Sequence, residues 1–184
     1  MLTSRRAAVT IAALLVPLSA TAQSLAFGLG PSVPIGSTND RLGGGYSIAA
    51  GIVTRTPVSF LDFRFDATFT ELRSKSVQGG RARMAAASAN VAAFFPRAPF
   101  AYFIPGVGAY RSSFTRTPIS IDNTIDIGFN MGAGLRGRLK RRVRESEVPQ
   151  SLNVFLEGRV HFVLSEVKPT IFLPITGGLL FSAP

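Results

Sequence analysis

The stretch Phe60–Phe69, with the sequence FLDFRFDATF, alternates strictly from Leu61 onward between two kinds of side chain. One parity is charged and consists of Asp62, Arg64 and Asp66. The other parity is apolar and consists of Leu61, Phe63, Phe65, Ala67 and Phe69. Strict alternation predicts a β-strand whose two faces meet different surroundings. The fold must therefore offer an apolar environment to one face of this strand and a polar environment to the other.

Two later stretches repeat the pattern. In 122–138 the odd positions include Ile125, Ile127 and Phe129, whereas the even positions include Asp126, Asn130 and several glycines. In 151–164 one parity is apolar and contains Leu152, Val154, Leu156, Val160, Phe162 and Leu164. The opposite parity contains Asn153, Glu157, Arg159 and His161. Both stretches have at least the roughly 9–11 residues that a tilted membrane-spanning strand needs.

The remaining chain divides into similar runs that are separated by glycine, proline and asparagine turn signals. We expect eight antiparallel strands in up-and-down order, near 25–35, 45–55, 60–71, 82–94, 100–113, 122–137, 152–164 and 169–181. Four prolines, Pro31, Pro34, Pro105 and Pro174, lie inside these runs, and each removes one backbone donor from the sheet. Bulges or strand ends are expected at these four positions.

The composition is consistent with a single apolar domain. Of 184 residues, 46% are hydrophobic and 16% are charged, with a formal net charge of +10. Cysteine is absent, which excludes disulfide bonds and thiolate metal sites.

Residues 1–22 have the layout of a cleavable secretory signal peptide. Arg5 and Arg6 precede an apolar run from Ala7 to Leu18, and Ala20-Thr21-Ala22 forms a small-residue cleavage site. An uncleaved N-terminal anchor is the alternative. No later run approaches the roughly 18 apolar residues of a spanning helix, so insertion into a membrane would have to use strands. The mature domain is expected to be 23–184.

Side-chain size predicts which face is inside. An eight-stranded barrel has an interior only wide enough to be filled by side chains, and a full set of phenylalanine rings would overfill it. The bulky parity is therefore expected to face lipid: Leu61, Phe63, Phe65, Phe69, Ile125, Ile127, Phe129, Leu156 and Phe162. The compact and charged parity is expected to form a polar network in the lumen: Asp62, Arg64, Asp66, Asp126, Asn130, Glu157, Arg159 and His161. Turning a strand over would cost about 2–4 kcal/mol for a cation at the bilayer midplane.

On these residues the chain resembles the small outer-membrane β-barrels of the OmpA/OmpX kind, in the group of outer-membrane beta-barrel domain proteins. The resemblance covers FLDFRFDATF, FIPGVGAYR (103–111), IDIGFNMGAGLRGRL (125–139), LNVFLEGRVHFVL (152–164) and FLPITGGLLF (172–181). It implies a monomeric transmembrane barrel in the outer membrane of a Gram-negative-type bacterium, with the N-terminus in the periplasm. It also implies that Phe181, with Leu179, is the signal read by the barrel assembly machinery, although Ser182-Ala183-Pro184 follow.

Two motifs are weak evidence for chemistry. Gly132–Gly137 spells G-x-G-x-x-G, but it lies within an alternating run, whereas a dinucleotide site needs a helix there. His161 is the only histidine; its neighbours Ser165 and Glu157 are each four residues away, about 13 Å along a strand. A packed lumen histidine is the favoured interpretation, and we expect no catalytic, cofactor or metal site.

Basic residues form two groups. Arg136 to Arg144 form a run that we interpret as a solvated turn near anionic headgroups, because export argues against nucleic-acid binding. Arg73, Lys75, Arg81, Arg83, Arg111 and Arg116 are expected near outward loops, where they would pair with lipopolysaccharide phosphates.

The sequence thus favours an integral outer-membrane barrel with a structural or surface-interaction role and a plugged lumen. Three alternatives stay open: a secreted lipocalin-like barrel that carries an apolar ligand, a lipid-modifying barrel enzyme that uses His161, and a narrow passive pore.

Overall fold

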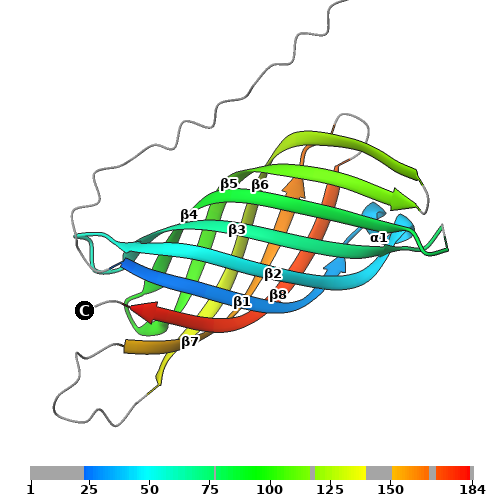
Figure 1. Ribbon diagram of the computed structural model, residues 1–184. Coiled ribbons are helices and arrows are strands. Elements are labelled where there is room, and N and C mark those ends of the chain that lie inside the picture. The colour runs from blue at the N-terminus through cyan, green and yellow to red at the C-terminus, as the bar shows by residue number, and fades with distance from the viewer. Residues whose placement is uncertain (1–22, 77, 117–118, 140–150, 166–168, 183–184) are drawn as a thin grey trace, which may run out of the picture.

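The computed structural model describes residues 23–76, 78–116, 119–139, 151–165 and 169–182; the predicted signal peptide lies outside them (Figure 1). The elements are β1 (Gln23–Pro34), α1 (Ser37–Arg41), β2 (Leu42–Arg55), β3 (Leu61–Ser74), β4 (Arg81–Phe95), β5 (Ala98–Arg116), β6 (Ile119–Leu139), β7 (Ser151–Val163) and β8 (Thr170–Ser182). In the described chain, no helix is of a length and apolarity that would let it span a membrane.

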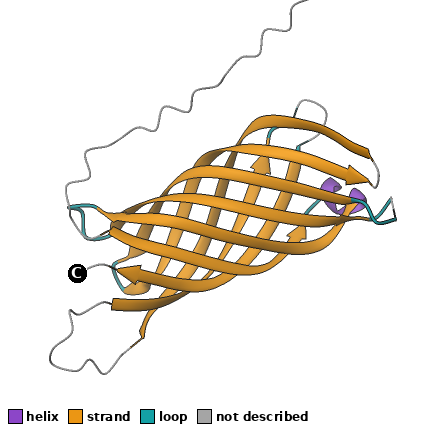
Figure 2. Cartoon of the chain, in the orientation of Figure 1, coloured by secondary structure: helices purple, strands orange, loops and turns teal. Residues whose placement is uncertain are grey.

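The eight strands form one closed antiparallel barrel. Each strand pairs with its neighbours in sequence, and β8 returns to pair with β1. The eight expected strands are all present, so the prediction of an all-β, up-and-down, eight-stranded fold is confirmed. The strands wrap obliquely around the barrel, and α1 lies at one end of it (Figure 2). We call this the α1 end; the other, where β1 begins and β8 ends, is the terminal end.

The prolines affect the sheet differently from the prediction. Only Pro34 lies at a strand end. Each of the other three prolines pairs with a residue of one neighbouring strand and lies at a gap in the pairing with the other neighbouring strand. These prolines are Pro31, Pro105 and Pro174, and the register does not shift across any of the gaps. The missing N–H of proline costs one ladder bond, and the neighbouring pairs keep the strands aligned. The register shifts lie instead at 43–45, 94–95 and 112–114.

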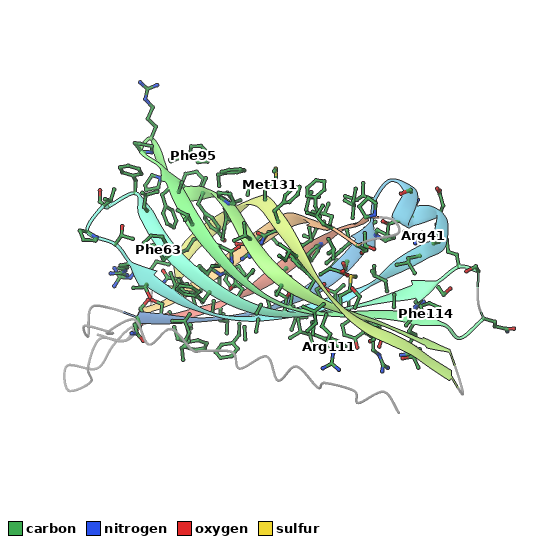
Figure 3. All side chains as sticks on the ribbon, turned by 90° about the horizontal axis from the view of Figure 1, so that it is seen from above. Arg41, Phe63, Phe95, Arg111, Phe114 and Met131 are labelled. Carbon is green, nitrogen blue, oxygen red and sulfur yellow. The ribbon has the colours of Figure 1, made fainter. Side chains whose placement is uncertain are left out.

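The outer wall is rich in exposed apolar side chains. Phe65 is 53% exposed, Ile127 73% and Val107 63%. Phe95 and Met131 project away from the barrel, as Figure 3 shows, and both are exposed. The bulky parity therefore points away from the axis.

The barrel interior contains more large side chains than the size argument predicted. Tyr102, Ile104 and Tyr110 on β5, and Phe155 and Phe172 on β7 and β8, are buried. The rings fit because glycines on neighbouring strands leave room. A Cβ on Gly134 would overlap the Tyr102 ring, one on Gly128 would lie 2.7 Å from the Tyr110 ring, and one on Gly178 would lie 2.7 Å from the Phe155 ring. The large rings of β3 and β6 point outward, whereas these five side chains point inward, where the glycines leave room.

We expect Gly132→Val to destabilise the barrel by about 1–3 kcal/mol, the usual cost of overpacking. Gly132 lies opposite Arg159, and a Cβ there would overlap the carbonyl oxygen of Gly158 and lie 2.7 Å from the Cα of Arg159. Gly137→Val is the matched control on the same strand, because its nearest neighbour would be a Val154 methyl at 3.7 Å. Urea unfolding in detergent, followed by gel mobility, measures both. Equal stability of the two variants would contradict the packing described here.

Candidate functional site

Four charged side chains from two strands on opposite sides of the barrel meet near its middle. We call this the ionic cluster: Arg64 and Asp66 of β3, and Glu157 and Arg159 of β7. Arg64 Nε donates to Asp66 Oδ1 at 2.7 Å, and Arg64 Nη1 donates to Glu157 Oε2 at 3.0 Å. Arg159 pairs with Asp66 Oδ2 at 2.7 Å, and its Nε donates to Glu157 Oε1. Each carboxylate thus touches both guanidinium groups, and the four charges sum to zero.

The cluster is held in place by neutral neighbours. Tyr102 donates its hydroxyl to Glu157 Oε2 at 2.8 Å, and Asn90 Nδ2 donates to Asp66 Oδ2 at 3.0 Å. The guanidinium carbon of Arg64 lies 5.3 Å from the centre of the Phe155 ring. Glycines again make space: Gly51 lies opposite Asp66, and Gly106 lies opposite Asn90. All four charged residues of the cluster are at most 5% exposed, so the arrangement is largely withdrawn from solvent.

Apolar layers cover the ionic cluster on both sides. Toward the α1 end lie Leu72, Met84, Tyr110, Val163 and Phe172. Toward the terminal end lie Ala26, Val53, Phe155 and Leu180, together with Ala92, Tyr102 and Ile104. The ionic cluster is therefore an electrostatic layer between two hydrophobic ones.

His161 belongs to the interior and not to a triad. Its Nδ1 lies 2.9 Å from the Tyr110 hydroxyl, and its ring stacks on Phe172 with centroids 4.9 Å apart. The ring is 2% exposed. A cavity of about 20 Å³, large enough for one water molecule, is lined by His161, Glu157 and Arg159. The serine considered from the sequence, Ser165, makes no hydrogen bond to His161 in the described part of the chain.

The other residues expected in the lumen have different surroundings. Asp62 pairs with Arg136 at 3.3 Å near the terminal end, and Arg136 lies 4.3 Å from the centre of the Phe94 ring. Asn130 is 1% exposed, and its amide lies beside the Tyr110 hydroxyl. Asp126, opposite Tyr110 on β6, is half-buried and lies outside the ionic cluster.

Several residues of the interior network were not predicted from the sequence. Arg136 was assigned to a solvated basic run, yet it points inward from β6 to Asp62. Arg136 has the same even parity as Asn130 and Gly132, and this parity was the feature of the sequence that indicates an inward side chain. Asn90 was missed because β4 is rich in alanine on both faces, and Tyr102 because bulky residues were expected outside.

The residues predicted to face lipid lie on the outer wall. Phe63, Phe65, Phe69, Ile125, Ile127, Phe129 and Leu156 are exposed, whereas Leu61 and Phe162 are half-buried. Phe162 stacks on Phe129 with ring centroids 4.7 Å apart. Leu179 and Phe181, the predicted assembly signal, are exposed at the end of β8, and Phe181 contacts the ring of Phe27 edge-on.

A basic cluster lies on the same outer wall, next to the apolar surface at the α1 end. We call Arg73, Arg81, Arg83 and Arg111 the basic wall cluster. Arg111 lies opposite Ala85, which lies opposite Phe69, so all three share the outer face. Figure 3 shows Arg111 projecting from the barrel. Arg81 and Arg83 both bond Glu71, at 2.7 and 2.8 Å. Lys75 instead binds Asn39, and the side chain of Arg116 lies outside the described residues.

The glycine-rich motif has a structural role. Gly132–Gly137 lies within β6, where Gly132 and Gly134 face Arg159 and Tyr102 across the strands. In the described ranges, histidine, cysteine and carboxylate residues form no group of three that could hold a metal ion.

Comparison with known proteins gives a fold and no family. No protein-family model matches the chain, and no curated protein does. Among solved structures it is similar to the crystal structure of Neisserial surface protein A (NspA), with a TM-score of 0.56 and 14% identity, over 86% of this chain and 95% of that one. The likeness is one of fold. It supports a small closed barrel, and the chemistry of this chain has to be argued from its own residues.

Proposed function

We propose that this protein is an integral outer-membrane barrel that acts in the envelope as a structural or surface-interaction protein, without catalysis. The observation that carries the proposal is the outer wall, where apolar side chains are exposed around the barrel, Phe27, Ile48, Phe65, Val107, Ile127 and Leu156 among them. Exposed apolar surface on this scale marks contact with membrane or protein. A secreted lipocalin-like barrel would place this bulk inside, around its ligand.

The likeness to a neisserial surface protein supports the same localisation. So does the predicted signal peptide. The lumen is proposed to be closed, because the ionic cluster fills the middle and apolar layers lie on either side of it. Aqueous channels belong to barrels with more strands. Enzymatic use of His161 is disfavoured because its ring is packed between Tyr110 and Phe172.

The basic wall cluster gives the surface role a chemical partner. Arg73 and Arg81 lie on the outer face four residues beyond Phe69 and Ala85 toward the α1 end, and Arg111 lies opposite Ala85. A phosphate of an outer-leaflet lipid would lie at this height while the acyl chains cover the apolar surface. Arginine binds phosphate through two parallel hydrogen bonds, which are stronger than neutral ones. We therefore propose lipopolysaccharide as the lipid partner.

We expect the triple variant Arg73→Gln, Arg81→Gln, Arg111→Gln to retain roughly tenfold less lipopolysaccharide through detergent purification, equivalent to about 1.4 kcal/mol. Arg83 is left in place so that Glu71 keeps one partner. The matched control is Arg55→Gln, Arg97→Gln, Arg138→Gln, which removes three exposed positive charges from the terminal end. Phosphate analysis of the purified proteins measures retention, and a heat-dependent gel shift shows that each barrel is folded. Equal retention by the two triple variants would refute the lipopolysaccharide site.

A further inference from the structure

The lumen opens into a cup at the α1 end. The cavity has a volume of about 360 Å³, within the range of small-molecule pockets. Its lining includes residues of five strands, β2, β3, β4, β5 and β8, among them Leu42, Ala82, Met84, Ser112 and Phe114. Arg41, the last residue of α1, stands at its edge. Figure 3 places Arg41 and Phe114 at the same end of the barrel.

The wall formed by α1 is fixed by bonds to both sides of the opening. The Thr38 hydroxyl accepts a hydrogen bond from the backbone N–H of Ile171 at 2.9 Å. Lys75 donates its ammonium to the carbonyl of Asn39 at 2.6 Å, and its backbone N–H to the carbonyl of Arg41 at 2.9 Å. The cup is therefore preformed, and a ligand would not have to order it.

The floor and the edge differ in chemistry. The floor is the apolar layer that includes Leu72, Met84 and Tyr110, with Leu42 and Ala82 packed against it. The edge carries the hydroxyls of Ser74, Ser112 and Thr170 and the guanidinium of Arg41. Of the carboxylates described near the edge of the cup, Glu71 is already bonded by Arg81 and Arg83, and Asp40 adjoins Arg41 in sequence. Arg41 itself forms no ion pair with any described residue.

From this arrangement we infer that the cup binds a single-chain amphiphile with a carboxylate head, its aliphatic chain on the floor and its head against Arg41 and the edge hydroxyls. An apolar pocket with a few convergent polar groups is the usual form of a small-molecule site. Of the basic wall cluster, Arg83 alone lines the cup, and its guanidinium is already bonded to Glu71. The three arginines replaced in the lipopolysaccharide test, Arg73, Arg81 and Arg111, do not line it. Binding of an amphiphile in the cup and binding of lipopolysaccharide on the outer wall are tested separately, so one proposal can be refuted without the other.

The three methionines of the chain make a direct test possible. Met84 lines the cup, Met131 lies on the outer wall, and Met1 belongs to the predicted signal peptide. Octanoate titrated into the detergent-solubilised barrel, labelled with ¹³C-methyl methionine, is expected to shift the Met84 signal and leave Met131 in place. Each added methylene, from hexanoate to octanoate, should strengthen binding about fourfold. A shift of Met131 with no saturable shift of Met84 would mean partition into the micelle and overturn the inference.

Two pairs of probes separate the head from the chain. Arg41→Gln should weaken octanoate binding by up to about fivefold, the upper limit for an exposed ion pair, and leave 1-octanol binding unchanged. Ala82→Phe should fill the cup and abolish the Met84 response to both ligands. Ala85→Phe on the outer face of the same strand is its control and should bind octanoate as the unchanged protein does. Normal octanoate binding by a folded Ala82→Phe barrel, or an equal loss of octanol binding in Arg41→Gln, would contradict the assignment.

Discussion

Replacing Glu157 with leucine is expected to destabilise the folded barrel by about 3–5 kcal/mol, the cost of breaking a buried ion pair by removing one partner. Glu157 accepts hydrogen bonds from Arg64, Arg159 and Tyr102, and it is 3% exposed. Its loss leaves two guanidinium groups that share the single carboxylate of Asp66. One positive charge is then buried without a counter-charge.

A double variant tests whether the unbalanced buried charge causes the loss of stability. The double variant Glu157→Leu, Arg159→Met keeps the cluster neutral, because Arg64 and Asp66 still pair at 2.7 Å. It is expected to be more stable than Glu157→Leu alone, since replacing a whole buried pair by apolar groups is often close to neutral. Simple addition of the two single-variant effects would contradict the charge-balance argument.

The measurement is urea unfolding in detergent, read as the heat-dependent gel shift of the folded barrel, because the chain has no tryptophan. Asp62→Asn is the control. Its partner Arg136 has a side chain 28% exposed, and so solvent offsets most of the loss. We expect at most about 1 kcal/mol for this substitution, as for exposed pairs. A Glu157→Leu effect no larger than that of Asp62→Asn would mean that the ionic cluster does not stabilise the fold.

The alternation of residues was sufficient to predict the strands and which way most side chains point. In β3, β6 and β7 the sequence separates charged or small residues from bulky ones, so the two faces could be assigned without coordinates. The charged parity of β3 and β7, which contains Arg64 and Asp66 on one strand and Glu157 and Arg159 on the other, was the basis for expecting a polar network in the lumen. The pairing of β3 with β7 across the barrel could not be predicted, because it depends on the curvature of the closed sheet.

The interior rings could not be predicted for a related reason. Tyr102 lies inside because Gly134 lies opposite it, and Phe155 because Gly178 does. Which residues lie opposite each other is decided by the register between strands, and a single sequence does not supply that register. The alanine-rich strand β4 shows the same limit, since its two faces differ too little in size or polarity for alternation to assign Asn90 or Arg83.

Phe65→Arg is expected to destabilise the barrel in lipid vesicles by at least about 2–4 kcal/mol, the cost of a cationic side chain at the bilayer midplane. Phe65 is 53% exposed on the outer wall and lies opposite Ile52 and Ala89, in the middle of the apolar surface of β3. The phenylalanine removed from lipid adds to the loss, by about 1.5–3 kcal/mol if its contact with lipid is complete.

Phe65→Arg distinguishes an outer wall that contacts lipid from an outer wall that contacts water. In a soluble barrel Phe65 would face water, and arginine there would change the stability by no more than about 0.5 kcal/mol. Phe65→Leu keeps an apolar group at the same place and should be tolerated in vesicles, while Ser76→Arg adds the same charge at an exposed residue between β3 and β4. Reversible unfolding from vesicles compares the three variants. If Phe65→Arg is as stable as Ser76→Arg, the outer wall does not contact lipid, and the placement of this barrel in a membrane is wrong.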